Sequence, residues 1–326
     1  SKATAPWTLT NVPSGGTLRA VSTSGSTATL TINEGKGAAD TSVGSFKIAL
    51  AANPSAIRDS AGNQASFAAT APGDLAKPTL RTLQMFDGDA NAKVDEVKAT
   101  FSETLAPSTS TATGPWTLTD VPSGGTLSAV STSGSDATLA INEGGGGADT
   151  SVGSFKVALA ANASDIRDAA ANQASFVATT PSDLAGPVLM TATSGSGTTT
   201  NLMQAGDTLA LTFSEALASN SVPGRRDVTE SRSSSTGTLT LPGLVTPTTI
   251  DSTYLDKSGD SATSSATYVL TKDTVTVTLG RLTANGSVAA GSGGASIFPA
   301  ASLKDPAGNA AASAAPATAR PVSPLF

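Results

Sequence analysis

Hydrophobic and polar residues alternate over short stretches along most of this chain. Val97, Ala99 and Phe101 alternate with Lys98 and Thr100. The same period of two is found at residues 137–141, 155–159, 209–213 and 275–279. Such runs, separated by Gly-Gly, Ser-Gly and Pro, predict half-buried antiparallel strands. No stretch sustains a period of 3.6, so we expect at most a helical turn or two, with residues 54–58 as the first candidate.

The predicted strands belong to a repeated sequence. Residues 1–78 align without a gap on residues 110–187, and 61 of these 78 positions are identical. A third, divergent copy is marked by two shared motifs. These are Thr-Phe-Ser-Glu at 100–103 and 212–215, and Asp-x-x-Gly-Asn at 59–63 and 305–309. Periods of this length are typical of arrays of similar structural units.

The repeat gives the expected domain boundaries. About seven short strands in residues 77–185, spaced at about 8–12 residues, favour a β-sandwich. We therefore expect an all-β chain of tandem immunoglobulin-like β-sandwich domains at 1–76, 77–185 and 186–326. The third copy is about 25 residues longer, and we place its insertion near 221–265, as a long loop or an extra hairpin.

The first copy lacks the opening strands that residues 77–109 supply to the second copy. Either this chain was cut from a longer array, or a neighbouring molecule supplies the missing strands. In both cases an open sheet edge is expected, and open edges invite pairing with another chain.

The two motifs give the chain a family resemblance. Thr-Phe-Ser-Glu near the start of a copy and Asp-x-x-Gly-Asn near its end resemble the bacterial immunoglobulin-like repeats of large cell-surface proteins. Such repeats occur in adhesins, surface-layer proteins and motility-associated cell-surface proteins. The resemblance implies an extracellular scaffold at the bacterial cell surface and does not name a partner.

Composition narrows the possible partners. The chain has a net charge of −6 and a pI near 4.7, so it offers no electrostatic attraction for nucleic acid. It contains no run of about 18 apolar residues, so we expect no membrane span. It also contains no Cys, which excludes disulfides and thiol chemistry.

We expect no catalytic residues. The Phe-Ser-Glu segments suggest a Ser/Glu pair, but a catalytic Ser needs an adjacent base, usually His, and the chain has no His. The sequence favours an inward Phe and a solvent-facing Glu at the strand end, which applies to Glu103 and Glu215. Trp7 and Trp116 occupy one repeat position and are interpreted as core anchors.

One acidic segment is a candidate calcium loop. Asp87, Asp89, Asn91 and Asp95 stand at positions 1, 3, 5 and 9 of such a loop, and calcium prefers oxygen ligands of this kind. Two positions depart from the EF-hand pattern, since Ala occupies position 6 and Lys position 12. A solvated acidic turn held by side-chain-to-backbone hydrogen bonds is the alternative.

The Asp-x-x-Gly-Asn motif is interpreted as a turn, in which Gly takes a positive φ and Asp and Asn bind nearby backbone. The second copy has Ala170-Ala171-Asn172 instead. We expect a distorted turn there, because Ala replaces the Gly.

The sequence therefore predicts a structural protein, a rod of similar domains that forms part of a surface layer, filament or stalk. Its partners would be neighbouring repeats and other copies of itself, because near-identical units present near-identical lateral surfaces. Two alternatives remain open. The chain could be an adhesin that binds a glycan or host protein through the third domain, or the non-catalytic region of a large secreted enzyme.

Overall fold

The computed structural model describes residues 4–107, 113–197, 199, 202–250, 253–288, 291, 294–312 and 320–322. Over these residues the chain is all-β, as predicted, and it contains no α-helix. Three short 3-10 turns occur, at Pro13–Gly15, Pro122–Gly124 and Ser219–Ser221. Within the same residues, no helix has the length and apolar character needed to cross a membrane.

The helical turn expected at residues 54–58 is wrong. The segment forms an irregular turn, in which the side chain of Asn53 accepts a hydrogen bond of 2.8 Å from the backbone N–H of Ser55. Such a local side-chain bond gives the backbone an alternative to helical pairing.

Repeat 1, as residues 1–76 are called below, contains two small sheets. One has the strand order β1-β4-β5 and the other is the hairpin β2-β3. The strands are β1 (Trp7–Thr10), β2 (Thr17–Ser24), β3 (Thr27–Asn33), β4 (Lys47–Leu50) and β5 (Phe67–Thr70). The buried apolar side chains among its described residues are Val21, Phe46, Leu50 and Ala56.

Repeat 2 (residues 77–185) contains the same strands and three more. Its two sheets have the orders β13-β6-β7-β10-β9 and β12-β11-β8. The strands are β6 (Leu80–Phe86), β7 (Glu96–Phe101), β8 (Trp116–Thr119), β9 (Thr126–Ser133), β10 (Asp136–Asn142), β11 (Lys156–Leu159), β12 (Phe176–Thr179) and β13 (Ser182–Asp183). The hairpin β6–β7 and the short β13 have no counterpart in repeat 1.

The strand β7 lies at the centre of the core of repeat 2. Val97, Ala99 and Phe101 are all 0% exposed, which confirms the predicted alternation. Trp116 packs edge-on against Phe176, with ring centroids 5.8 Å apart, and both belong to this core.

Repeat 3 (residues 186–326) has a different sheet arrangement. Its strands form one sheet in the order β14-β15-β20-β19-β16-β17-β18-β21-β22, and the first and last strands lie close to each other. The strands are β14 (Leu189–Gly195), β15 (Thr208–Phe213), β16 (Arg225–Ser233), β17 (Thr236–Thr240), β18 (Thr248–Ile250), β19 (Ser261–Thr271), β20 (Thr274–Ala284), β21 (Ala295–Ile297) and β22 (Arg320–Val322).

The hairpin β16–β17 accounts for the continuous sheet in repeat 3. It lies within residues 221–265, where the third copy is longer than the others, and it has no counterpart in repeat 2. One of its strands pairs with β19 and the other with β18. It therefore joins strands that would otherwise belong to two separate sheets, and the result is a nearly closed, barrel-like sheet.

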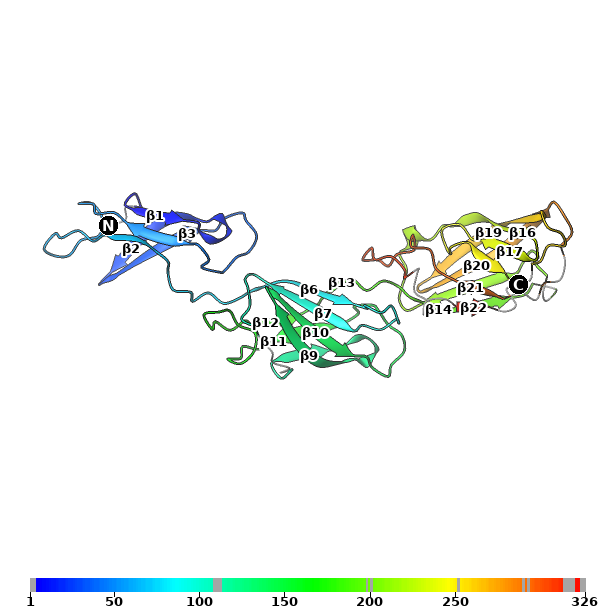
Figure 1. Ribbon diagram of the computed structural model, residues 1–326, viewed down its shortest axis with the longest axis horizontal. Helices are drawn as coiled ribbons and strands as arrows, with labels where there is room; N and C mark the ends of the chain where they lie inside the picture. The colour runs from blue at the N-terminus through cyan, green and yellow to red at the C-terminus, as the bar shows by residue number, and fades with distance from the viewer. Residues whose placement is uncertain are drawn as a thin grey trace.

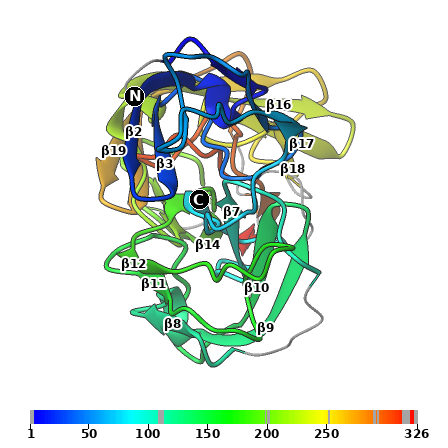
Figure 2. The same ribbon diagram turned by 90° about the vertical axis from the view of Figure 1, so that its left-hand side faces the viewer.

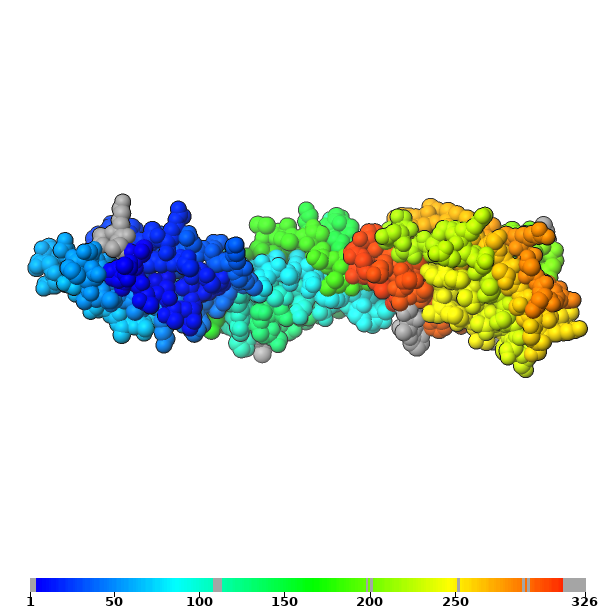
Figure 3. Space-filling view, turned by 90° about the horizontal axis from the view of Figure 1, so that it is seen from above, coloured from blue at the N-terminus to red at the C-terminus, as the bar shows by residue number. Residues whose placement is uncertain are grey.

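The three repeats follow one another along the long axis of the molecule (Figure 1). Seen from above, they form a single row (Figure 3). The view along the axis shows that repeat 2 is displaced sideways from repeats 1 and 3 (Figure 2). Each repeat thus meets only its neighbours, and the contacts between them are confined to the joints.

Candidate metal centres in repeat 2 and at the joints

The structure brings three of the four predicted calcium ligands together. Asp87, Asp89 and Asp95 each offer a carboxylate oxygen, and these oxygens lie within 4.8 Å of one another. They belong to the turn between β6 and β7. Ala92 adopts a φ of 77° at the position where an EF-hand loop has Gly, so the backbone makes the required turn with a side chain in place.

Asn91 points its amide nitrogen at the acidic groups of this loop. Its Nδ2 donates to Asp89 Oδ2 at 3.0 Å and to Glu143 Oε1 at 2.6 Å. Its backbone N–H donates to Asp87 and Asp89. In this orientation Asn91 stabilises the carboxylates by donating hydrogen bonds, and it would have to turn its amide to coordinate a cation through oxygen.

The ionisation of this loop is constrained by its surroundings. Burial raises the pKa of Asp87 to about 6, although hydrogen bonds from the backbone of Ala92 and Asn91 work in the opposite direction. The neighbouring Asp89 raises the pKa further. A cation bound here would relieve both the burial penalty and the repulsion.

A second acidic cluster lies at the joint between repeats 1 and 2. It consists of Asp74 from the connecting segment, Glu103 just after β7, and Asp168 from the turn near the end of repeat 2. The carboxylate oxygens lie within 4.8 Å of one another. Thr41 of repeat 1 donates a hydrogen bond to Glu103 and lies 2.6 Å from the hydroxyl of Ser102.

The joint between repeats 2 and 3 repeats this arrangement. Asp183, Glu215 and Asp305 occupy the places of the three acids, again with oxygens within 4.8 Å. Thr150 of repeat 2 donates to Glu215 at 2.6 Å and lies 2.7 Å from the hydroxyl of Ser214. The same five side chains therefore build both joints.

The expectation that the two Glu side chains face solvent is wrong. Glu103 is 7% exposed and Glu215 is 6% exposed, because the loop of the preceding repeat covers the strand end. Burial, with a smaller contribution from the charges of Asp183 and Asp305, raises the pKa of Glu215 to about 8, although the hydrogen bond from Thr150 opposes this increase. Burial likewise raises the pKa of Glu103, and that of Asp183 to about 6.

The Asp-x-x-x-Asn turn holds one acid of each joint in place. Asp168 Oδ2 accepts from Asn172 Nδ2 at 2.7 Å, and Asp305 Oδ2 accepts from Asn309 Nδ2 at the same distance. The turn of repeat 2 is not distorted as expected, because Ala171 adopts a φ of 71° in place of the Gly.

Each of the three clusters has a donor set that suits calcium. Calcium–oxygen distances of about 2.3–2.6 Å allow two oxygens of one ion to lie up to about 5 Å apart, so carboxylates whose oxygens lie within 4.8 Å of one another can share an ion. At the joint between repeats 1 and 2, a hollow of about 450 Å³ adjoins Asp74, Glu103 and Asp168, so ions can reach the acids from solvent.

The joint clusters were not predicted from sequence, although a signal existed. The segments Asp40-Thr-Ser42 and Asp149-Thr-Ser151 recur together with Phe-Ser-Glu and Asp-x-x-x-Asn. Phe-Ser-Glu was interpreted by itself as a strand end and the Asp/Asn motif as a turn, and the Asp-Thr-Ser segments were given no role. Their meeting depends on how one repeat lies against the next, which a repeat considered alone does not reveal.

Comparison of the chain with protein-family models, curated proteins and solved structures found no match.

Proposed function

We propose that this chain is an extracellular structural protein, a rod of tandem immunoglobulin-like domains that forms part of a surface layer, filament or stalk, with the sheet of the third domain closed into a barrel-like form. The repeats serve as spacers and the joints fix the direction from one repeat to the next. This role requires no reaction, and we propose none.

The observation that carries this proposal is the joint built twice from the same side chains. At each joint a threonine hydroxyl of one repeat binds the Ser-Glu pair of the next, through the half-buried Thr41 at the first joint and the buried Thr150 at the second. A flexible tether would need no such contact. Residues placed alike at successive joints favour one repeated orientation, which is what a rod requires.

Calcium is the cofactor that we propose for this rod. Three carboxylates lie within 4.8 Å of one another in the Asp87–Asp95 loop and at each joint, and burial and mutual repulsion oppose their ionisation. The loop is also coupled to the second joint. Ala92 accepts a hydrogen bond from the backbone N–H of Asp149, whose carboxylate raises the pKa of Glu215.

Electron microscopy of the purified chain, with calcium and with a chelator, tests the structural role. We expect straight rods that associate side by side or end to end when calcium is present. Dispersed rods that never associate but bind glycans or host proteins would instead support adhesion. Rods whose repeats take random directions in calcium would contradict the proposed joints.

Calorimetric titration with calcium tests the cofactor separately. We expect binding that is reduced by Asp87→Asn with Asp95→Asn in the loop, and by Glu215→Gln at the joint. Glu34→Gln is a matched control, because Glu34 corresponds to Glu143 in a repeat without the acidic loop. If calcium gives no heat of binding and no shift in melting temperature, calcium binding is excluded, but the proposed rod is not contradicted.

A further inference from the structure

The sequence of repeat 1 is nearly the same as that of residues 110–185 in repeat 2. Its apolar side chains are much more exposed to solvent. Leu139 in β10 is 0% exposed, whereas Leu30 at the same position in β3 is only half-buried. Phe67 is 43% exposed, although it contacts Trp7 just as Phe176 contacts Trp116. Residues suited to a core are therefore left open to solvent on one side.

The uncovered side follows one edge of β3. In repeat 2, β10 pairs with β9 on one side and with β7 on the other. Among the described residues, β3 pairs only with β2. Its second edge, along Thr27–Asn33, is a row of strand backbone groups with no strand beside it, and such an edge is a template for strand addition.

A groove of about 940 Å³ lies at one end of this edge, lined by Gly25, Ser26, Arg58 and Asp59. In repeat 2 the corresponding groove is filled by the last residue of β7 and the segment that follows it. There the backbone N–H groups of Phe101, Leu105 and Ala106 bind the carbonyl groups of Ser135, Gly134 and Arg167, respectively. Each of these three acceptors corresponds to a residue that lines the empty groove.

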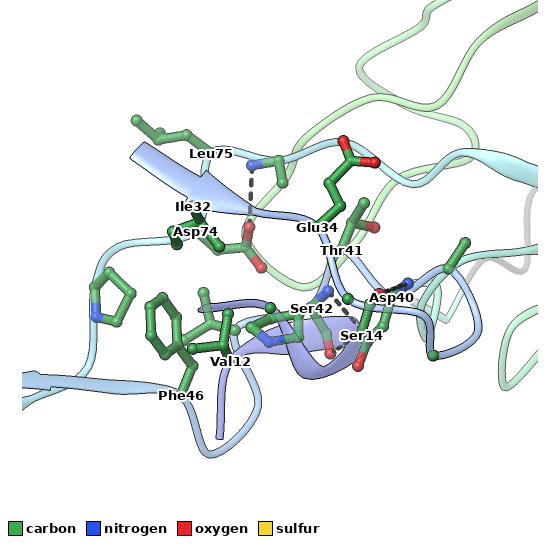
Figure 4. Close-up of a pocket in the computed structure, with 18 of the residues that line it drawn as sticks. Val12, Ser14, Ile32, Glu34, Asp40, Thr41, Ser42, Phe46, Asp74 and Leu75 are labelled. Carbon is green, nitrogen blue, oxygen red and sulfur yellow. Dashed lines mark hydrogen bonds between the residues drawn. The ribbon is translucent and has the colours of Figure 1, made fainter. Parts of the chain in front are cut away.

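A second groove, of about 690 Å³, lies at the other end and is shown in Figure 4. It is lined by Ile32, Glu34, Gly35, Asp40 and Leu75, among others. In repeat 2 all five corresponding residues bind the hairpin β6–β7 or its turn. They are Ile141, Glu143, Gly144, Asp149 and Leu184, whose partners are Asp95, Asn91, Lys93, Ala92 and Met85, respectively.

We propose that repeat 1 is a strand acceptor, in which the free edge of β3 and the two grooves bind a β-hairpin with the sequence pattern of residues 80–105. The pattern consists of inward Val, Ala and Phe at the positions of Val97, Ala99 and Phe101, and a turn that reaches the second groove. Pairing in the register of repeat 2 places the residue equivalent to Val97 opposite Leu30 and that equivalent to Thr100 opposite Thr27.

The occupant is a further copy of this hairpin from outside these 326 residues. Repeats 1 and 2 present two equivalent acceptor edges, β3 and β10, but only one hairpin of this kind, β6–β7, which is already bound to β10. A second copy of the chain could supply the hairpin β6–β7 to β3 only by removing it from its own repeat 2, so the exchange of this hairpin between identical chains gains no strand pairing.

One of the substitutions between the two acceptors changes a charged residue. Lys98 forms an ion pair of 2.7 Å with Asp136 across the β7–β10 pair, but Thr27 occupies the position of Asp136 in β3. The residue at the Lys98 position of the incoming hairpin therefore has no charged partner in repeat 1. We expect that replacing it leaves binding unchanged.

Hydrogen exchange of the full chain tests this proposal. A synthetic peptide of residues 77–109 is added in excess, and exchange is followed in residues 27–33 and in residues 136–142. We expect exchange in β3 to slow by about tenfold or more, while β10 is unchanged because it is already paired. A Lys98→Ala peptide should act like the original, and a Val97→Asp, Phe101→Asp peptide should have no effect.

A second version of the experiment does not depend on the solubility of a peptide. Residues 77–109 are repeated directly ahead of Ser1 in the full chain, which reproduces the connection found in repeat 2. Protection of β3 in this extended chain, lost with Val97→Asp and Phe101→Asp in the added segment, supports the proposal. Unchanged exchange in β3 overturns it. Protection of β3 in the unmodified chain, together with the mass of a dimer, shows a second copy as the occupant and also overturns it.

Discussion

Thr150 of repeat 2 donates a hydrogen bond of 2.6 Å to the carboxylate of Glu215 in repeat 3. Both residues are buried, and the Thr150 hydroxyl also lies 2.7 Å from Ser214 Oγ. Ser214 in turn accepts a bond of 3.0 Å from the backbone of Val188, at the start of repeat 3. One hydroxyl group of repeat 2 is thus part of the network that orders the first residues of the next repeat.

Thr150→Val keeps the shape of this side chain and removes its hydroxyl. We expect the contact between repeats 2 and 3 to weaken by about 1–3 kcal/mol, because buried polar groups lose a partner. Calorimetry should show the unfolding of repeat 3 at a lower temperature, less coupled to that of repeat 2. Ser151→Ala is the control, since the Ser151 hydroxyl bonds Asp149 within its own loop. Equal effects of both variants would contradict the special role of Thr150.

The second joint should lose stability with rising pH when calcium is removed. The pKa of Glu215 is about 8 in the folded chain and 4.5 as its reference value, so the folded state holds the proton more tightly. The stabilisation from this group is fully present below pH 4.5 and is lost as the pH rises through about 8. Melting curves from pH 4 to 9 in chelator should show this fall, and Glu215→Gln should remove it. Parallel curves for the two proteins would disprove the assignment.

Ala171→Gly should stabilise repeat 2. Ala171 holds a φ of 71°, which costs a side-chain-bearing residue roughly 1–2 kcal/mol. Gly removes this strain but adds freedom to the unfolded chain, so we expect a net gain of about 0.5–1 kcal/mol in chemical unfolding. Ala170→Gly, at a neighbouring position outside the positive-φ region, should destabilise. A loss of stability in both variants would show that the strain is not relieved.

Asp165→Ala should stabilise repeat 2 at neutral pH. Asp165 is 2% exposed, and neither carboxylate oxygen has a hydrogen-bond partner among the described residues. Repeat 1 has Ala56 at this position, where it is also buried, so the smaller side chain suits the site. We expect a gain of about 1–3 kcal/mol at pH 7 in urea unfolding.

The pH dependence of this gain provides its check. Burial raises the pKa of Asp165 above its reference value of 3.8, and the indole of Trp116 offsets part of the increase without reaching hydrogen-bond geometry. Below pH 3.8 the carboxyl is protonated in both states and the two proteins should be closest in stability. The gain should grow as the pH rises through the folded pKa. A constant difference at all pH values would point to packing instead of charge.

Strand positions could be predicted from the sequence because burial within one repeat imposes a period of two. Val97, Ala99 and Phe101 follow that rule, since β7 lies between β6 and β10 of the same repeat. The acidic cluster of Asp87, Asp89 and Asp95 was also recognisable, because these residues are local in sequence and meet through one turn.

The joints and the closure of repeat 3 could not be predicted in the same way. Glu103 and Glu215 each lie just after the end of a strand, where a charged side chain is expected to face solvent. They are buried because the preceding repeat covers them. Likewise, the hairpin β16–β17 pairs with β19 on one side and β18 on the other. The alternation of apolar and polar residues in the hairpin predicts its strands but not their partners. Contacts of long sequence separation decide both features.

The ion pair between Lys98 and Asp136 has a consequence for the route by which the chain folds. During refolding, the hairpin that contains Lys98 meets two acceptor edges of nearly the same sequence. Phe101 is 35 residues from Asp136 and 74 from Thr27, and a doubling of loop length costs only about 0.6 kcal/mol. An ion pair that is partly exposed to solvent adds only a small preference for Asp136, because solvent and salt screen it. Correct strand pairing between near-identical repeats therefore depends on a few divergent positions, which direct each strand to its own repeat during folding.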